Sequence, residues 1–597
     1  MMSKEKKYLL YGMVLVLIAA MGLTFAYFAA GIEGSKKVIN VTWADLKIVF
    51  NNGDAIQADN IKPGWSTTNT FSVENQTKNV YKYNIVIEDL YNTFVTTGFL
   101  KYKITSTDGG YNMTEFKDVP KSSKATNTIL AYSVEIPANT THNYTIEFVY
   151  EASDTVDQSD DMGKILSGKL YISKGGYPNL LTVMLRDNPT ISERTKFSDY
   201  FKQNTSGTIY KTNKTEDGTD VYYYAGNTTN NWVKFGKETI QECTYNGEQV
   251  QYAIFYRDET GNKTSGFKEV RNVASSEECV STNVCSASGG SIIGLTEEQC
   301  NNLYGTTWTT DKATAGSKVE KDIYWRIIRT NEDKSVRLLY SGLDPSTTKG
   351  YIGASVFNLS YNDPMYVGYM YGTSGSSDSN RTNTNDSTIK TFIDKWYENN
   401  LLTNYDKYIS KTAIYCNDRS VPNNNYSTST SSDFDYGAYT RLRENKTPSY
   451  KCGANISNGL FESTQATADK FSVSTEGGGN GKLTYPTALM TADEVSFAGG
   501  VSFPEIGVDA WYVTNSEGNW IIKGSWWTLS PSDWDGSDAY VWNVASGSSR
   551  SGGLFRNTVL LSNGVRPVIS LLSCVTIKSG DGTPESPYEI DYDVSCN

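Results

Sequence analysis

The first part of the chain alternates apolar and polar positions with a period of two. Residues 46–50, LKIVF, and residues 81–89, YKYNIVIED, put every second apolar side chain on one face, and residues 100–105 and 144–150 repeat this. Turn sequences such as NNGD, KPGW and TDGG separate the runs. Alternating segments divided by turns are typical of antiparallel sheets with one buried face. The pattern therefore predicts an all-β, jelly-roll-like sandwich over residues 36–175.

From residue 176 to 597 the pattern mixes helices with strands. In residues 386–401 the apolar side chains recur at helical spacing. Residues 489–500, LMTADEVSFAGG, combine a capping box of Thr491 and Glu494 with a glycine stop. Short apolar strands such as AYVWNV follow near the C-terminus. This order predicts an α+β domain.

A Cys-bearing, turn-rich stretch interrupts this domain at about residues 237–321. The apolar strands on either side of it would naturally follow one another in a hairpin, so the stretch is predicted to be an insertion. Inside it, LTEEQCNNLYG predicts a short helix with a capping box of Thr296 and Gln299.

Residues 1–35 predict a cytoplasmic tail followed by a targeting segment. The sequence KEKK precedes Tyr8–Ala30, a run without charge, which would span roughly 34 Å as a helix, enough to cross a bilayer. Lysines before the run favour a single-pass cell-membrane protein with residues 8–30 in the bilayer and its C-terminal part outside. A signal cleaved near Ala26, giving a secreted protein, is the alternative. Both interpretations put residue 31 onward outside the cytoplasm.

The eight cysteines fit an oxidising compartment. No CxxC motif occurs, which argues against zinc ribbons and thioredoxin-like redox chemistry. Spacing alone leaves the connectivity open, but it suggests four local disulfides: Cys243 with Cys279, Cys285 with Cys300, Cys416 with Cys452, and Cys574 with Cys596.

Charge and histidine content restrict the possible chemistry. The formal net charge is -12, and no Lys/Arg cluster appears, so nucleic acid is not an expected partner. The chain has one histidine, His142, whereas zinc sites and nucleophile–base pairs usually need histidine. Because His142 lies in a polar turn before a strand, we expect it to be a surface residue. An enzyme would have to depend on carboxylates, and we expect no enzymatic activity.

The stretch WWTLSPSDWDGSDAYVWNV contains the candidate ligand-binding residues. Trp526 and Trp527 begin a strand and are expected in the core. Trp534 lies in the polar sequence SPSDWDGSD, which predicts an exposed loop tryptophan on a binding rim. Arg550 and Arg556 are predicted on a facing loop, where they could meet an anionic or sugar ligand. Both arginines could equally well be ordinary surface charges without a ligand.

The same loop contains a candidate metal site. The carboxylates of Asp533, Asp535 and Asp538 could hold a hard cation, so calcium is a possible cofactor, although none is firmly indicated. Val544 stands where an EF-hand would need a glutamate, which excludes that motif. An ordinary Asp–Gly turn with solvated carboxylates is the alternative.

The N-terminal part resembles the biofilm-fibre and camelysin-type secreted proteins of Gram-positive bacteria. The resemblance rests on GLTFAYF at 22–28, IKPGWSTTNTFSVENQT at 61–77 and SGKLYIS at 167–173. It implies a surface-exposed β-sandwich that could self-associate by pairing strands with neighbours. Camelysin-type members have been called metalloproteases, but this chain has no HExxH motif, so that activity is not carried over.

The C-terminal part resembles an uncharacterised C-type-lectin-like domain of Gram-positive surface proteins. The matching residues include YWRII, LMTADEVSFAGG, WWTLSPS and GVRPVISL. The resemblance implies a binding scaffold rather than a reaction. The expected fold is thus multidomain: a transmembrane helix, an all-β sandwich and an α+β C-type-lectin-like domain.

The expected function is a surface-exposed, non-enzymatic adhesion or ligand-binding protein that takes an extracellular glycan or protein. A structural subunit of an extracellular fibre is the first alternative. A carboxylate-based extracellular enzyme is the second.

Overall fold

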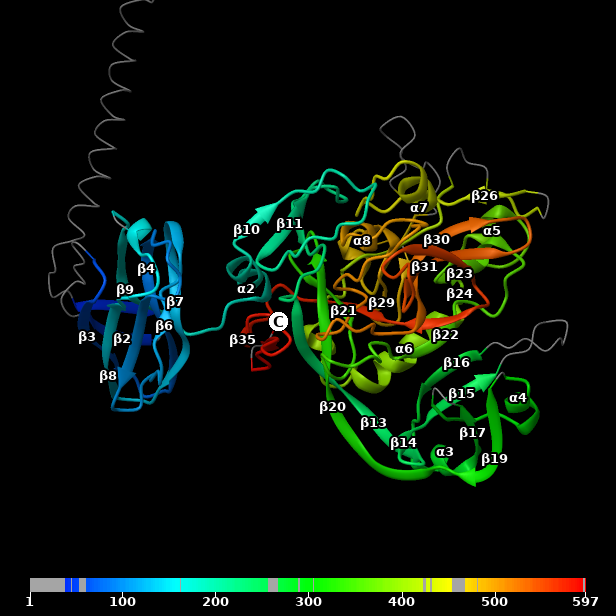
Figure 1. Ribbon diagram of the computed structural model, residues 1–597, viewed down its shortest axis with the longest axis horizontal. Coiled ribbons are helices and arrows are strands. Elements are labelled where there is room, and N and C mark those ends of the chain that lie inside the picture. Colours follow the sequence, from blue (N-terminus) through cyan, green and yellow to red (C-terminus); the bar gives the residue numbers. More distant parts are fainter. Residues whose placement is uncertain are drawn as a thin grey trace, which may run out of the picture. The chain divides into compact units, whose positions relative to one another are not determined.

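The computed structural model divides the chain into two compact units, Met1–Tyr177 (unit 1) and Pro178–Asn597 (unit 2), drawn in blue to cyan and in cyan to red (Figure 1). It describes residues 38–597 with the exception of 44–45, 53–60, 162, 256–266, 288–289, 304, 422–425, 430–431, 454–467, 480, 594–595 and 597.

Unit 1 is a β-sandwich of two antiparallel sheets, which confirms the sandwich expected from the alternating pattern. The larger sheet has the order β1 (Val38–Trp43), β2 (Leu46–Asn52), β3 (Trp65–Asn75), β8 (Thr140–Tyr150), β5 (Leu100–Ser106) and β6 (Lys117–Asp118). The smaller has the order β7 (Ser122–Ile136), β4 (Tyr81–Asn92) and β9 (Leu166–Lys174). Inward-facing side chains of both sheets, including Ile85, Ile104 and Ile146, share one core.

The single histidine lies inside this sandwich, so the predicted surface position is wrong. His142 belongs to β8 and is 2% exposed. Its Nδ1 lies 3.0 Å from the Tyr83 hydroxyl, which also contacts the Tyr144 hydroxyl. The prediction failed because β8 begins at Thr140, which puts residue 142 in phase with the inward-facing positions that follow. Burial lowers the pKa of His142, although the nearby Asp108 carboxylate acts in the opposite direction.

We predict that unit 1 loses stability as the pH falls below the ordinary histidine pKa of 6.5. The folded pKa is the lower one, so the unfolded chain takes up the proton first, and the stability present above pH 6.5 declines below it. Hydrogen exchange of β4 and β8 peptides at about pH 7.5 and about pH 5.5 measures this, after correction for intrinsic exchange rates. His142→Gln is the control and should remove the pH effect; an equally large effect in this variant would contradict the prediction.

Unit 2 is built on two large mixed sheets. The first has the order β10 (Thr190–Ser192), β11 (Thr208–Thr212), β12 (Val221–Tyr223), β20 (Thr314–Thr330), β13 (Trp232–Tyr245), β36 (Tyr588–Ile590) and β35 (Ile577–Ser579). Four further strands join it: β14 (Glu248–Gln249), β21 (Val336–Tyr340), β29 (Ala488–Leu489) and β34 (Pro567–Leu571). Strand β34 pairs with both β21 and β29, which brings distant parts of the chain into one layer.

The second large sheet contains the strands of the aromatic stretch. Its order is β19 (Thr306–Lys312), β17 (Asn283–Ala287), β18 (Ile292–Ile293), β15 (Gln251–Phe255), β16 (Phe267–Asn272), β22 (Gly353–Val356), β33 (Ser562–Val565), β30 (Gly524–Trp534), β31 (Ala539–Ser546) and β32 (Leu554–Thr558), with β26 (Phe434–Asp435) paired to β30. Two small sheets complete the unit: β23 (Met370–Tyr371) with β24 (Asn385–Asp386), and β25 (Tyr415–Asp418) with β27 (Ala468–Ser472) and β28 (Gly481–Lys482).

The helices of unit 2 are short. They are α2 (Leu180–Asp187), α3 (Ser276–Ser281), α4 (Glu297–Asn301), α5 (Ser377–Asn380), α6 (Thr388–Asn400), α7 (Gly437–Tyr439) and α8 (Ala492–Phe497). The predicted helices at α6 and α8 are present, and both predicted capping boxes, at α4 and α8, are confirmed.

The predicted fold class is nevertheless wrong. The structure is mostly β-sheet, with 42% strand and 13% helix. The α+β prediction gave too much weight to helices such as α8, which has six residues, and did not include short strands such as β25 and β27. Throughout the described ranges, no helix is long and apolar enough to cross a membrane. The segment predicted to do so, residues 8–30, lies outside them.

A small lobe is inserted between β13 and β20. These strands pair antiparallel along most of their length, from Trp232 opposite Arg326 to Thr244 opposite Thr314. The chain between them forms β14 to β19 with α3 and α4, and Figure 1 shows this lobe at the far end of the two long strands. The flanking strands therefore pair as expected, and their pairing continues well into the predicted insertion.

All four predicted disulfides are confirmed. Consecutive cysteines pair two by two: Cys243 with Cys279, Cys285 with Cys300, Cys416 with Cys452, and Cys574 with Cys596. Disulfides persist in oxidising compartments. The pairing therefore indicates an extracellular or secreted protein.

Candidate functional site

The tryptophan predicted to form a binding rim lies in the core. Strand β30 continues to Trp534, with β31 on one side and β26 on the other, where Phe434 faces Trp534. Trp534 is therefore 1% exposed, and Trp526 and Trp527 are fully buried. The exposed-loop prediction failed because β26 comes from a distant part of the sequence. Local polarity cannot show that a second strand will cover this one.

The three aspartates of the candidate calcium site do not converge. Asp533 is 3% exposed and pairs with Arg556 of β32. Asp535 accepts a hydrogen bond of 2.8 Å from the backbone N–H of Asp538, which closes a turn. Within the described ranges, no group of three His, Cys, Asp or Glu side chains is placed to hold a metal ion. Asp535 and Asp538 therefore match the alternative interpretation of this stretch, an ordinary Asp–Gly turn.

The two arginines predicted to bind ligand have different surroundings. The Arg556 guanidinium is held by Asp533 and lies 4.6 Å from the centre of the Tyr540 ring. Arg550 is exposed, with its guanidinium 5.8 Å from the centre of the Phe555 ring. The structure therefore places one arginine in an ion pair on a strand and the other on the surface.

We predict that Trp534→Ala destabilises unit 2 about as much as Trp527→Ala, each by about 3–5 kcal/mol, because both remove a large buried side chain. Urea unfolding followed by near-UV circular dichroism measures the two changes. Trp520→Ala is the matched control, because Trp520 is 38% exposed, and it should cost much less. A Trp534→Ala variant as stable as the parent would mean that this side chain contributes little to the core.

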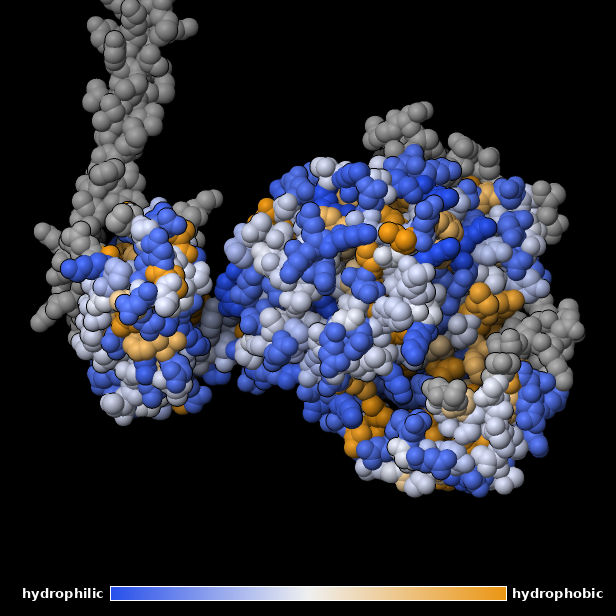
Figure 2. Space-filling view, viewed as in Figure 1, coloured by the Kyte–Doolittle hydropathy of each residue, from blue (hydrophilic) through white to orange (hydrophobic). Residues whose placement is uncertain are grey.

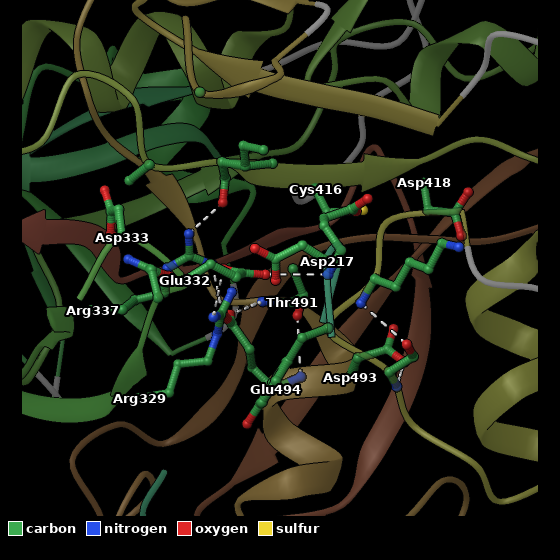
Figure 3. Close-up of a pocket in the computed structure, with 18 of the residues that line it drawn as sticks. Asp217, Arg329, Glu332, Asp333, Arg337, Cys416, Asp418, Thr491, Asp493 and Glu494 are labelled. Carbon is green, nitrogen blue, oxygen red and sulfur yellow. Dashed lines mark hydrogen bonds and ion pairs between the residues drawn. The ribbon is translucent and has the colours of Figure 1, made fainter. Parts of the chain in front are cut away.

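A pocket lined largely by charged and polar residues opens elsewhere in unit 2, with a volume of about 230 Å³ (Figure 3). Its walls come from the loop between β11 and β12, the connection of β20 to β21, the residues before β25, and the start of α8. Seven acidic and four basic residues line it. The charges fall into two groups: a buried set, called here the floor, and a more accessible set, called the mouth.

The first part of the floor is centred on Glu494, which is 1% exposed. Its Oε1 accepts hydrogen bonds from Nε of Arg329 at 3.0 Å and from Nη1 of Arg337 at 2.6 Å. Its Oε2 accepts one from the backbone N–H of Thr491 at 2.9 Å and so completes the capping box. Burial alone would raise the pKa of Glu494, but the two arginines outweigh it and lower the pKa. Figure 3 shows these side chains together.

The second part of the floor is a buried arginine held by two aspartates. Arg441 donates to both carboxylate oxygens of Asp493, at 3.0 and 2.8 Å, and to Asp418 at 2.6 Å. Burial would lower the pKa of Arg441, but the two aspartates outweigh it and raise the pKa. Paired and hydrogen-bonded in this way, the charges of the floor are fixed in position.

The mouth carries an excess of negative charge. Asp217 and Asp333 are exposed, and Glu216 and Glu332 are half-buried. Lys451 is the one basic residue on this side among the described lining residues, Lys470 pairs with Glu216 at 2.8 Å, and Nη1 of Arg329 lies 3.9 Å from Glu332. A hydrogen bond from the backbone N–H of Thr219 lowers the pKa of Asp217 and favours its charged form.

Sequence reasoning missed this pocket. It identified Thr491 and Glu494 only as a helix cap. The available signal was arginine inside apolar strands, as in YWRIIRT and VRLLY, because a charged side chain on a buried strand needs a partner. The partner residues come from α8, far away in the sequence, so the pattern alone cannot identify them.

Comparisons with known proteins add no function. No family model matches the chain, and no curated protein does. One solved structure, described as "AvmM Catalyzes Macrocyclization in Alchivemycin A Biosynthesis", aligns over 24% of this chain and 100% of its own, with 11% identity and a TM-score of 0.14. A likeness of that size carries no argument. The two family resemblances stay predictions.

We predict that Glu494→Gln destabilises unit 2 by about 3–5 kcal/mol, because it leaves the buried Arg337 without its carboxylate and Arg329 with only the more distant Glu332, at 3.9 Å. Glutamine can still complete a capping box, so the loss should exceed the roughly 1 kcal/mol typical of a lost cap. Urea unfolding measures the change, with the exposed Glu505→Gln as control. Equal stability of the two variants would show that the ion pairs contribute nothing.

Proposed function

We propose that the protein is an extracellular or secreted binding protein, without enzymatic activity, whose pocket in unit 2 binds the cationic amine of a small polar ligand. The proposal rests on the excess of negative charge at the mouth of the pocket. Its four carboxylates, Glu216, Asp217, Glu332 and Asp333, outnumber the three basic groups beside them, which are two lysines and one arginine of the floor. A cleft with an excess of one sign of charge attracts ligands of the opposite sign.

The floor supports binding rather than catalysis. A general acid or base works best with a pKa near the working pH, whereas the pKa of Glu494 is lowered by its arginines. Asp493 and Asp418 are both held by Arg441. Rigid charges of this kind suit the positioning of a polar ligand. The proposal includes no calcium or other cofactor.

The amine could belong to an amino sugar of a glycan or to a lysine side chain of a peptide. Both place an ammonium group beside hydrogen-bonding neighbours, which is the chemistry the mouth recognises. We therefore still propose an extracellular glycan or protein as the ligand. The proposed binding site is this pocket and no longer the surroundings of Trp534.

The test is calorimetric titration of the purified full chain with glucosamine and with lysine amide. Each is compared with its fully N-acetylated form, which for lysine amide means acetylation of both amines, so that the compared form lacks positive charge. We expect the amines to bind and the acetylated forms to bind at least about tenfold more weakly, a difference of about 1.4 kcal/mol. Binding of glucosamine alone would assign a glycan, and binding of lysine amide alone a peptide.

The matched variant is Asp217→Asn with Glu332→Gln, which keeps the shape of the mouth and removes two charges. It should weaken amine binding about tenfold or more. The control, Glu505→Gln with Glu517→Gln, removes two exposed charges outside the pocket and should bind like the parent. The proposal would be contradicted if the acetylated ligands bound as tightly as the amines. It would also be contradicted if the mouth variant bound the amines with unchanged affinity.

A further inference from the structure

Two buried arginines of unit 2 have no carboxylate partner in the described part of the chain. Arg326 of β20 is 2% exposed, and Arg566, between β33 and β34, is fully buried. The other deeply buried arginines each pair with an acid: Arg329 and Arg337 with Glu494, Arg419 with Asp469, and Arg441 with Asp418 and Asp493. The contrast singles out Arg326 and Arg566.

Neutral groups satisfy only part of these two guanidinium groups. Nε of Arg326 donates to Oδ1 of Asn231 at 2.5 Å, and its Nη2 donates to the carbonyl of Thr228 at 2.9 Å. Arg566 donates from Nε to the carbonyl of Tyr340 at 3.0 Å and from Nη1 to the carbonyl of Tyr512. Its Nη2 is buried and finds no hydrogen-bond partner among the described residues.

Aromatic faces cover both groups without neutralising them. The Arg326 guanidinium lies 4.3 Å from the centre of the Trp232 ring, and that of Arg566 lies 5.0 Å from Trp526. A cation–π contact is attractive but supplies no counter-charge. Burial lowers the pKa of Arg326 to about 9. Burial also lowers the pKa of Arg566, and repulsion from Arg326 lowers it further, so the two charges act on each other.

We propose that Arg326 and Arg566 form a buried site for a small inorganic anion, chloride, to which Nη2 of Arg566 donates. The two arginines meet the same strand: Arg326 lies opposite Leu339 of β21, and Arg566 donates to the carbonyl of the next residue, Tyr340. An unpaired buried charge is costly, whereas one anion between the two guanidinium groups would supply both with a counter-charge. Exposed fractions of 2% and 0% exclude a bulky ligand, because it could not enter without opening the core. The site is separate from the pocket, and the inference does not rest on the proposed function.

The test is the thermal stability of the full chain in sodium gluconate, with chloride or bromide replacing gluconate at constant ionic strength. We expect the unfolding temperature to rise with halide and to saturate, as linkage requires for an ion that binds only the folded state. Arg566→Lys, which removes Nη2, should abolish the rise. Arg419→Lys is the control and should keep it, because Arg419 already has Asp469 as its partner.

Anomalous diffraction from crystals grown in bromide provides a second measurement that needs no variant. A bromide peak beside Nη2 of Arg566 supports the site. Equal unfolding temperatures in halide and gluconate would overturn it, as would a halide effect that persists in Arg566→Lys or a crystal without that peak.

Discussion

Unit 2 depends on one carboxylate. Glu494 completes the cap of its own helix and binds Arg329 of β20 and Arg337 of β21, so one side chain joins α8 to two neighbouring strands of the first large sheet. In a medium of low polarity these bonds are strong when complete and costly when one partner is missing. This group holds both arginines and so forms the first part of the floor of the pocket.

Local features of the fold were predictable, and long-range contacts were not. The alternation in the first part of the chain, the capping boxes at Thr296 and Thr491, and the local disulfides involve residues close in sequence, and the structure agrees with each. Trp534 and His142 show the limit. One is buried because β26 covers β30, and the other because β8 starts earlier than the pattern suggests. The first cause cannot be seen in a local sequence window, whereas the second leaves a local signal, because His142 is in phase with the inward-facing positions that follow it.

The fold class was predicted wrongly and the pocket was missed for related reasons. Short strands such as β25 and β27 have too few residues to show a period, and they form because a distant partner is present. The buried arginines are the one sequence signal for the pocket, because an arginine in an apolar strand implies a partner without naming it. Arg326 and Arg329 lie three positions apart in β20, yet only Arg329 reaches a carboxylate in the described residues. Sequence marks both positions alike, and only the fold distinguishes them.

The order of the disulfides bears on how the protein is exported. Counted along the chain, the first cysteine bonds to the second, the third to the fourth and so on, so no loop encloses a cysteine that belongs to another pair. A chain that crosses a membrane from its N-terminus delivers both members of one pair before the first member of the next. Oxidation in order of emergence then gives the native pairs directly. The inserted lobe, with the first two pairs, can be closed before the last strands of the sheets it joins have left the translocation channel.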